Sequence, residues 1–152
     1  MDTITIHIGK HGLTPSSTFA GGNISPKIDL LGIPKDVHHV AMIVQDKSGV
    51  ENFKCLWSIW NLPAVGYISP GYDAGSAPKF PFPAVQGLND FGEHAWHGPS
   101  PGLGTTDRLL FQVFGRSEPL IISANAKMDE VIEALRDGKT TAHGSLEVTY
   151  QG

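Results

Sequence analysis

The sequence predicts a mainly β fold with one α-helix late in the chain, in a single domain spanning residues 1–152. Several short segments alternate apolar and polar residues or are continuously apolar, which is typical of strands, whereas only one segment has apolar residues at helical spacing. Most connections between the expected strands are too short for the crossovers that parallel strands require. We therefore expect a mainly antiparallel sheet.

Five segments carry the strand pattern, and the loops between them are rich in glycine and proline. In the run CLWSIWNL, alternation places Trp57 and Ile59 on one face and Ser58 and Trp60 on the other. The expected strands are Thr3–Ile8, His38–Gln45, Cys55–Leu62, Arg108–Gly115 and Ala142–Tyr150, while Lys10–Asp29 and Ala64–Pro83 are expected to be mostly loop.

The expected helix covers about residues 127–137. Its apolar residues follow the i, i+3, i+4, i+7 spacing that puts them on one helical face. They are Met128, Val131, Ile132 and Leu135. Asn125 is placed to cap the start of this helix, and Gly138 is placed to end it.

Composition and charge exclude several classes of protein. The formal net charge of −4 argues against nucleic-acid binding, which needs a basic face. The chain has no long apolar run, so we expect no membrane insertion. Its first ten residues lack the order of a secretory signal, and Cys55 is the only cysteine, which excludes an intrachain disulfide. We therefore expect a cytoplasmic protein.

The segment Gly87–Gly115 concentrates the polar residues that are candidates for chemistry. Glu93, His94 and His97 lie close together, but the glycines and prolines around them disfavour a helix, and two histidines are too few ligands for a metal site. We therefore expect neither a metal nor another cofactor. His97 is either a donor or general base at the rim of a pocket, because imidazole titrates near neutral pH, or a solvent-exposed loop residue.

Four segments, taken together and in order, resemble the phosphatidylethanolamine-binding protein family in its short bacterial and archaeal, Raf-kinase-inhibitor-like form. The match covers most of the chain. The segments are GGNISPKIDLLGIP at Gly21–Pro34; Asp46 followed by LWSIWNLP at Leu56–Pro63; NDFG at Asn89–Gly92 leading to HGPSPGLGTTDRLLFQVF at His97–Phe114; and the helix followed by SLEVTY at Ser145–Tyr150.

The resemblance implies a mainly antiparallel β fold with a small pocket for phosphate-like or other anionic groups. That pocket would lie between the loop after Asp46, the strand at Trp57 and the loop Gly98–Pro101. The resemblance also places Trp57 and Trp96 among the pocket aromatics and suggests a cis peptide bond at Pro99. Short members of this family are often dimers, so a homodimer is one expectation.

The chain departs from the family pattern where the pocket would be. One family histidine falls on Leu56, a second falls on Asp107, and the family tyrosine falls on Leu109. A carboxylate at position 107 would repel a phosphate group, by ~1 kcal/mol in water-like surroundings and by several when partly dry. The resemblance therefore predicts a pocket altered towards a less anionic and more apolar ligand.

Two functions remain open. The first is a small-molecule-binding protein for an apolar metabolite or a phosphate-like anion. The second is a cofactor-independent enzyme in which Asp107, His97 and Asp46 perform acid/base chemistry, such as isomerisation, dehydration or cyclisation of an apolar metabolite. The residues predicted to contact the ligand are Asp46, Leu56, Trp57, Trp96, His97, Gly98, Pro99, Pro101, Asp107 and Leu109.

Overall fold

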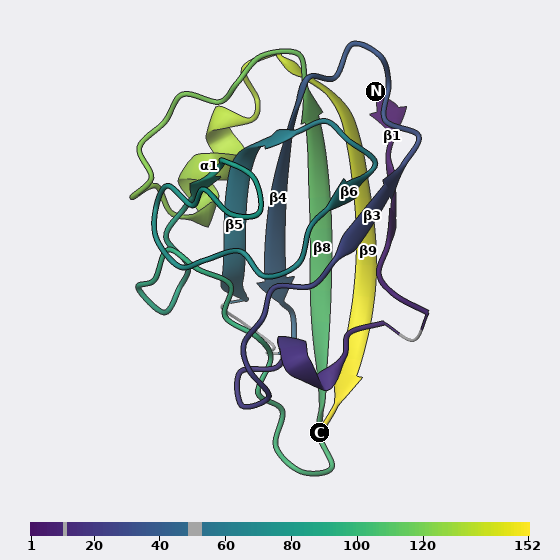
Figure 1. Ribbon diagram of the computed structural model, residues 1–152, viewed down its shortest axis with the longest axis vertical. Helices are drawn as coiled ribbons and strands as arrows, with labels where there is room; N and C mark the ends of the chain where they lie inside the picture. Colours follow the sequence, from purple (N-terminus) through teal and green to yellow (C-terminus); the bar gives the residue numbers. More distant parts are fainter. Residues whose placement is uncertain (11, 49–52) are drawn as a thin grey trace.

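Two β-sheets face each other across a shared core in the computed structural model, which describes residues 1–10, 12–48 and 53–152 (Figure 1). The larger sheet has six strands in the order β1-β9-β8-β4-β5-β7, and the smaller has three in the order β2-β3-β6. The predicted mainly β fold with one late helix is confirmed. The strands are β1 (Asp2–Thr3), β2 (Thr5–His7), β3 (Ile28–Leu31), β4 (His39–Asp46), β5 (Lys54–Pro63), β6 (Tyr67–Ile68), β7 (Val85–Gln86), β8 (Thr106–Arg116) and β9 (Thr140–Gln151).

Four long strands form the centre of the larger sheet, and the sequence predicted each of them to within two residues at either end. β4 pairs with β5 on one side and with β8 on the other, and β8 pairs with β9. All three pairings are antiparallel, as expected. Among the described pairings, only the short one between β1 and β9 is parallel.

The predicted strand Thr3–Ile8 is divided between the two sheets. β1 pairs with β9 in the larger sheet, and β2 pairs with β3 in the smaller one. The crossing occurs at Ile4, whose N–H donates to the carbonyl of His143 at 2.9 Å. Gly144 permits this crossing, because a Cβ there would lie 1.8 Å from the Ile4 carbonyl oxygen.

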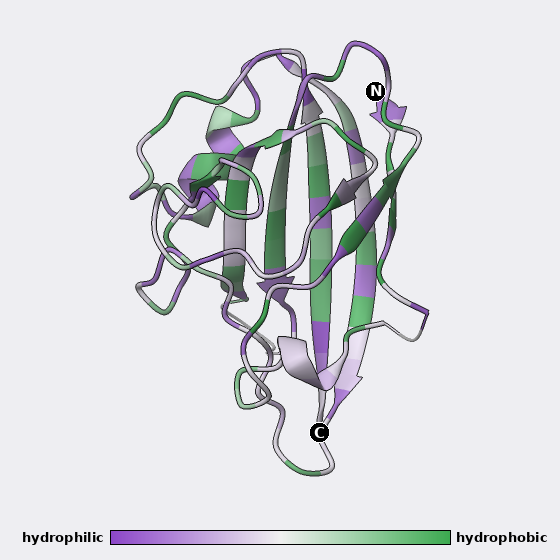
Figure 2. Cartoon of the chain, in the orientation of Figure 1, coloured by the Kyte–Doolittle hydropathy of each residue, from purple (hydrophilic) through white to green (hydrophobic). Residues whose placement is uncertain are grey.

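The main core fills the space between the sheets, and alternation along the strands decides which side chains enter it. In β5, Trp57 and Ile59 point into this core, whereas Trp60 points to the opposite face of the sheet, as the sequence predicted. Figure 2 shows β4 hydrophobic over most of its length, because both of its faces are covered. β8 alternates instead, because its outer face is only partly covered.

A second, smaller core lies under helix α1 (Met128–Ala134) on the other face of the larger sheet. There Val131 and Leu135 pack with Ile43 of β4 and Trp60 of β5. Burial of this apolar stripe explains why the helix forms where the sequence predicted it. No helix in the described part of the chain has the length and apolarity needed to cross a membrane.

The helix is shorter than the predicted 127–137, and its start is capped differently. Asn125 does not cap it, so that prediction is wrong; the Glu130 carboxylate instead accepts a hydrogen bond from the Lys127 N–H at 3.3 Å. The helix ends with Leu135 as its C-cap, and the Leu135 carbonyl accepts a hydrogen bond from the Thr140 hydroxyl at 2.7 Å. Gly138, with φ +83°, lies in the turn that follows.

Three short strands were not predicted, namely β3, β6 and β7. The last of these carries Gln86, whose side chain is fully buried. Its amide nitrogen donates to the carbonyls of Asp73, Gly75 and His94 at 2.8, 2.9 and 3.2 Å. Its amide oxygen accepts a hydrogen bond from the indole N–H of Trp57 at 2.7 Å. This one side chain therefore attaches the long loop after β5 to the main core.

Arg116, at the end of β8, is a buried cation with a full set of partners. Its guanidinium donates to both carboxylate oxygens of Asp137 at 2.9 and 2.7 Å and to the Thr140 hydroxyl at 3.0 Å. The hydrogen bond from Arg116 is the main reason that the pKa of Asp137 is lowered to about 2. The pair thus links β8 to the turn that joins α1 to β9.

We expect Asp137→Asn to lower the free energy of unfolding by about 1 kcal/mol at neutral pH, since hydrogen bonds to charged groups contribute up to about 3 kcal/mol and this carboxylate is partly exposed. Because the pKa of Asp137 is depressed in the folded state, the pair stabilises the fold fully above the unfolded pKa of about 4. This contribution is lost as the pH falls through about 2. Urea denaturation at a series of pH values checks this.

The matched control is Glu118→Gln, because Glu118 is exposed and its carboxylate lies 3.9 Å from the Lys139 ammonium. This variant should unfold like the parent chain at every pH. A difference between Asp137→Asn and the parent that stays constant down to pH ~2 would contradict the assigned ion pair.

Candidate functional site

A cavity of about 210 Å³ opens at the end of the larger sheet where β4 ends and β5 and β8 begin. Six of the residues predicted to contact a ligand line this cavity, and the structure adds two that the sequence did not single out, Phe91 and Ser100. The six are Asp46, Leu56, His97, Gly98, Pro99 and Asp107. The loop after β4, the start of β5 and the loop before β8 thus meet at one place.

The other four predicted residues do not line this cavity. Trp57 and Trp96 are 0% and 2% exposed and belong to the main core, where their rings make an edge contact at 5.6 Å. Leu109 is also fully buried in that core, and Pro101 lies one residue beyond the lining residue Ser100. The two tryptophans therefore belong to the core next to the cavity and do not form its wall.

The wall at Gly98 and Pro99 is held by the loop around η1 (Pro15–Ser17). Asn23, at φ +56°, accepts a hydrogen bond from the Gly98 N–H at 2.7 Å and donates one to the Trp96 carbonyl at 3.1 Å. The Phe19 N–H donates to the Pro99 carbonyl at 3.1 Å. A Cβ on Gly98 would lie 2.0 Å from the Ser17 carbonyl oxygen, so the two segments pack with no space for a side chain.

The predicted cis peptide bond at Pro99 is wrong. Among the described residues, the one cis bond precedes Pro81, in the loop Phe80–Pro83. The loop at Gly98 and Pro99 takes its shape from the hydrogen bonds to Asn23 and Phe19 instead.

The NDFG turn carries Phe91 to the cavity and is fixed to the start of β5. The Asn89 side-chain oxygen accepts hydrogen bonds from the N–H groups of Phe91 and Glu93, both at 2.9 Å. The Asp90 carboxylate accepts one from the Cys55 N–H at 2.7 Å. Cys55 is buried, and this burial is the main cause that raises the pKa of its thiol to about 12, so it is not a reactive thiolate.

His97 lies between two aromatic rings. Its imidazole stacks on Phe91 with a centroid distance of 3.6 Å and on Phe19 with a centroid distance of 4.5 Å. Its Nδ1 lies 3.0 Å from a carboxylate oxygen of Glu93, which fixes the orientation of the ring. The side chain is only 13% exposed, so the expectation of a solvent-exposed loop histidine is wrong.

The two carboxylates of the cavity are placed near each other by the turn after β4. Ser48 donates its N–H to Asp46 at 2.9 Å, and its hydroxyl accepts the Arg108 N–H at 2.8 Å. The pKa of Asp107 is raised, first by burial and then by the negative charge of Asp46, while contacts with Ser48 and Ser100 oppose the rise. No lysine or arginine is among the described residues that line the cavity.

The histidines of the segment Glu93–His97 do not converge. The Nδ1 of His94 lies 3.0 Å from the Gln86 carbonyl oxygen, whereas the Nδ1 of His97 lies 3.0 Å from a carboxylate oxygen of Glu93. Within residues 1–10, 12–48 and 53–152, no three His, Cys, Asp or Glu side chains are grouped as metal ligands.

Comparisons with known proteins identify the family of this chain. The model of the phosphatidylethanolamine-binding protein family matches residues 5–151. The chain belongs to this family. A UPF0098 protein of Methanothermobacter thermautotrophicus is 30% identical over 99% of this chain and 99% of its own length. The Escherichia coli UPF0098 protein YbcL is 35% identical over 75% of this chain and 67% of its own length.

Solved structures show the same fold. The crystal structure of the phosphatidylethanolamine-binding protein homolog CT736 from Chlamydia trachomatis superposes with a TM-score of 0.81 at 21% identity, covering 100% of this chain and 99% of the other. The crystal structure of Escherichia coli YbcL gives a TM-score of 0.80 at 24% identity, covering 98% of each chain. The family match and the two relatives above, rather than these structures, make this chain a UPF0098-type member of the family.

Sequence reasoning missed Phe91, Ser100 and Asn23 as residues that build the site. Phe91 and Asn23 both belong to motifs of the family, NDFG and GGNISP, so the motifs themselves were a signal for them. Ser100 lies in the predicted loop between two predicted lining residues. Phe19, which stacks on His97, lies in no such motif, and we see no sequence signal for it.

We expect Gly98→Ala to destabilise the fold by about 1–3 kcal/mol, because the added methyl group has no space against the Ser17 carbonyl. The matched control is Gly102→Ala in the same loop. There a Cβ meets only the Thr105 side chain at an ordinary 3.7 Å, so the change should stay within about 0.5 kcal/mol. Thermal or urea denaturation checks both variants, and equal stability of the two would contradict the described packing.

Proposed function

We propose that this protein binds a small molecule in the cavity lined by Asp46, Leu56, His97 and Asp107, and that its ligand is less anionic than a phosphate group. The observation that carries the proposal is the presence of both carboxylates in one cavity that contains no lysine or arginine among its described lining residues. Membership of the phosphatidylethanolamine-binding protein family supports binding of a small ligand in general. The two carboxylates of the lining then favour a neutral ligand over a phosphate-like anion.

Size and polarity narrow the ligand further. A cavity of about 210 Å³ is smaller than the 300–1,000 Å³ range of drug-sized sites, so it suits a compact metabolite. Leu56 and Phe91 supply apolar surface, while His97 and the main chain of the loop Gly98–Ser100 supply polar groups. A neutral metabolite with an apolar part and one or two polar groups fits this lining.

The altered pocket is part of the same proposal. Aligned by motif, Leu56 and Asp107 stand where the family pattern has histidines, and both now line the cavity. A phosphate there would meet two carboxylates, and each such pair costs about 1 kcal/mol in water-like surroundings and several kcal/mol when partly dry.

The test is a calorimetric or NMR titration with inorganic phosphate and O-phosphoethanolamine. We expect little or no saturable binding by the parent chain and at least about tenfold tighter binding by Asp107→His at pH 6, because the substitution replaces a repelling charge with a donor. The double variant Leu56→His, Asp107→His restores the family pattern and should bind at least as tightly.

Asp29→Asn is the control for loss of one negative charge, because Asp29 lies outside this cavity and pairs weakly with Lys27 at 3.8 Å. It should not change phosphate binding. Tight phosphate binding by the parent chain, weakened rather than strengthened in Asp107→His, would overturn the proposed ligand class.

A second candidate function is acid/base catalysis in the same cavity, and two observations favour it. Burial and the charge of Asp46 raise the pKa of Asp107, which moves this carboxyl towards the range useful for proton transfer. Glu93 orients the imidazole of His97 by a bond at 3.0 Å, as a carboxylate orients a catalytic histidine. The reaction would be a cofactor-independent isomerisation, dehydration or cyclisation.

We expect Asp46→Asn to lower the pKa of Asp107, because it removes the neighbouring negative charge that disfavours ionisation. Carboxyl-detected NMR titration of the parent and the variant measures this directly, with Asp29→Asn as the control that leaves the pKa unchanged. An unaltered Asp107 pKa in Asp46→Asn would remove the electrostatic coupling on which the catalytic candidate rests.

A further inference from the structure

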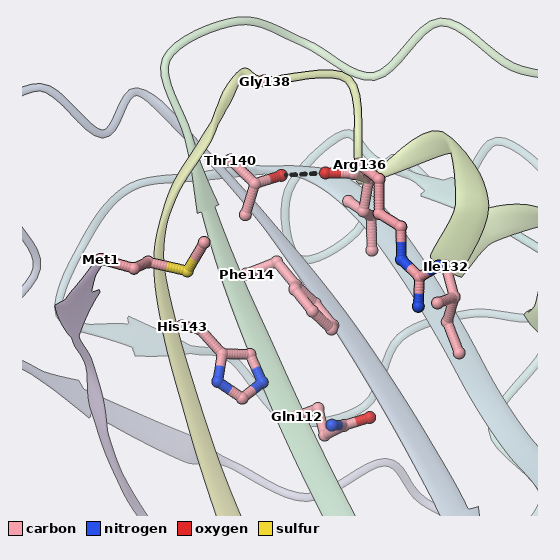
Figure 3. Close-up of a pocket in the computed structure, with 9 residues that line it drawn as sticks. Met1, Gln112, Phe114, Ile132, Arg136, Gly138, Thr140 and His143 are labelled. Atoms are coloured by element: carbon pink, nitrogen blue, oxygen red, sulfur yellow. Dashed lines mark hydrogen bonds between the residues drawn. The ribbon is translucent and has the colours of Figure 1, made fainter.

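A second and larger cavity, of about 450 Å³, lies on the helix side of the larger sheet towards the other end of β8 (Figure 3). It shares no lining residue with the candidate site. Its lining comes from β8, β9, α1 and the turn after α1, with Met1 at one edge. The lining residues are Met1, Gln112, Phe114, Ile132, Leu135, Arg136, Gly138, Thr140 and His143.

The cavity exists because the helix is too short to cover the whole sheet. The seven residues of α1 span only about 10 Å and pack over β4 and β5. The outer face of β8 and β9 beyond them lacks a covering helix among the described elements. There Phe114 and His143 lie opposite each other in register, with ring centroids 5.0 Å apart. Ile132 and Leu135 form the facing wall.

The turn that closes the cavity is well fixed. The Thr140 hydroxyl bonds the Leu135 carbonyl at 2.7 Å, drawn as a dashed line in Figure 3. On the strand side, Arg116 holds Asp137 in the same turn. The hollow is thus bounded by anchored backbone on both sides, which is the condition for a largely pre-formed ligand site.

The charge in this cavity is opposite to that of the candidate site. No aspartate or glutamate is among its described lining residues, whereas Arg136 contributes a guanidinium and His143 an imidazole. Figure 3 shows the Arg136 side chain extending from the turn along the side of Ile132, next to the space beside Phe114. The ion pair of Arg136 with Glu133 spans 3.6 Å between two largely exposed side chains, so it is weak and is readily exchanged for a ligand.

We propose that this cavity binds a small carboxylic acid with an aromatic or branched apolar body. The apolar body packs on Phe114, Ile132 and Leu135, and Arg136 pairs with the carboxylate through its two parallel N–H donors. Gln112 and His143 are within the same lining and supply further hydrogen-bond donors. Because the two cavities have no residue in common, this site is independent of the ligand proposed above.

The test is an amide NMR titration with 3-phenylpropionate, with the neutral 3-phenylpropionamide and the cationic 3-phenylpropylamine as matched probes. We expect saturable shifts centred on Gln112, Phe114 and His143 for the carboxylate, and at least tenfold weaker binding of the amide and the amine. Equal binding of all three probes, or shifts confined to the first cavity, would overturn the proposal.

Arg136→Gln should weaken binding of 3-phenylpropionate about tenfold, whereas Lys139→Gln should leave it unchanged. Lys139 is the matched control because it carries the same charge nearby but does not line the cavity. Ile132→Trp, at a partly exposed position, fills the cavity from its wall and should abolish binding. The amide signals of residues outside the cavity should still be those of the folded protein. Binding that is not weakened in Arg136→Gln, or binding that is retained in a folded Ile132→Trp, would overturn the assignment.

Discussion

The buried amide of Gln86 is the interaction on which the arrangement of the loops depends. The Gln86 side chain is fully buried and cannot bond to water, so each of its polar atoms needs a partner within the protein. Both the amide oxygen and the amide nitrogen have such partners. Those partners come from the long loop after β5, from the segment that leads to the candidate site and from Trp57 in the core. A group that bonds several carbonyls at once makes their positions mutually dependent, because losing it removes a hydrogen bond from each of them and from the buried indole of Trp57. The long segment between β5 and β8 is thereby held in one conformation although its only strands, β6 and β7, have two residues each.

The parts of the fold that the sequence predicted are those whose pattern is decided locally. Strands β4 and β5 are buried on both faces and appear in the sequence as largely apolar runs. The spacing of Met128, Val131, Ile132 and Leu135 fits only a helix. The missed strands β6 and β7 have two residues each, too few for any periodicity to be visible. The division of Thr3–Ile8 between two sheets was equally invisible, because Ile4 and Ile6 are buried whether the strand is whole or split. The division is permitted by the lack of a side chain at Gly144, on a strand far along the chain.

In the candidate cavity, too, the residues that were predicted are those marked by a local pattern in the sequence. Its polar and loop residues were found through motifs, since Asp46, Gly98 and Asp107 lie in or next to segments whose glycines and prolines indicate turns and loops. Trp57 and Trp96 were expected at its surface because the family resemblance places pocket aromatics at these two positions. Their indole N–H groups instead bond to Gln86 and to the Ser17 carbonyl, and this allows full burial. The stacking of Phe19 on His97 depends on how one loop lies against another, which no local pattern encodes.

The crossing at Ile4 also bears on the order in which the molecule is assembled. The first strand of the chain pairs with the last, and the residue between β1 and β2 bonds to that last strand as well. During synthesis, residues 2–4 therefore have their partner in the larger sheet only after residues 142–143 have been made. Contacts between such distant segments are slow to form because the closing loop is long. The pairing of β1 with β9 is thus expected to be among the final steps of folding, and Ile4 lacks its hydrogen-bond partner on β9 until then.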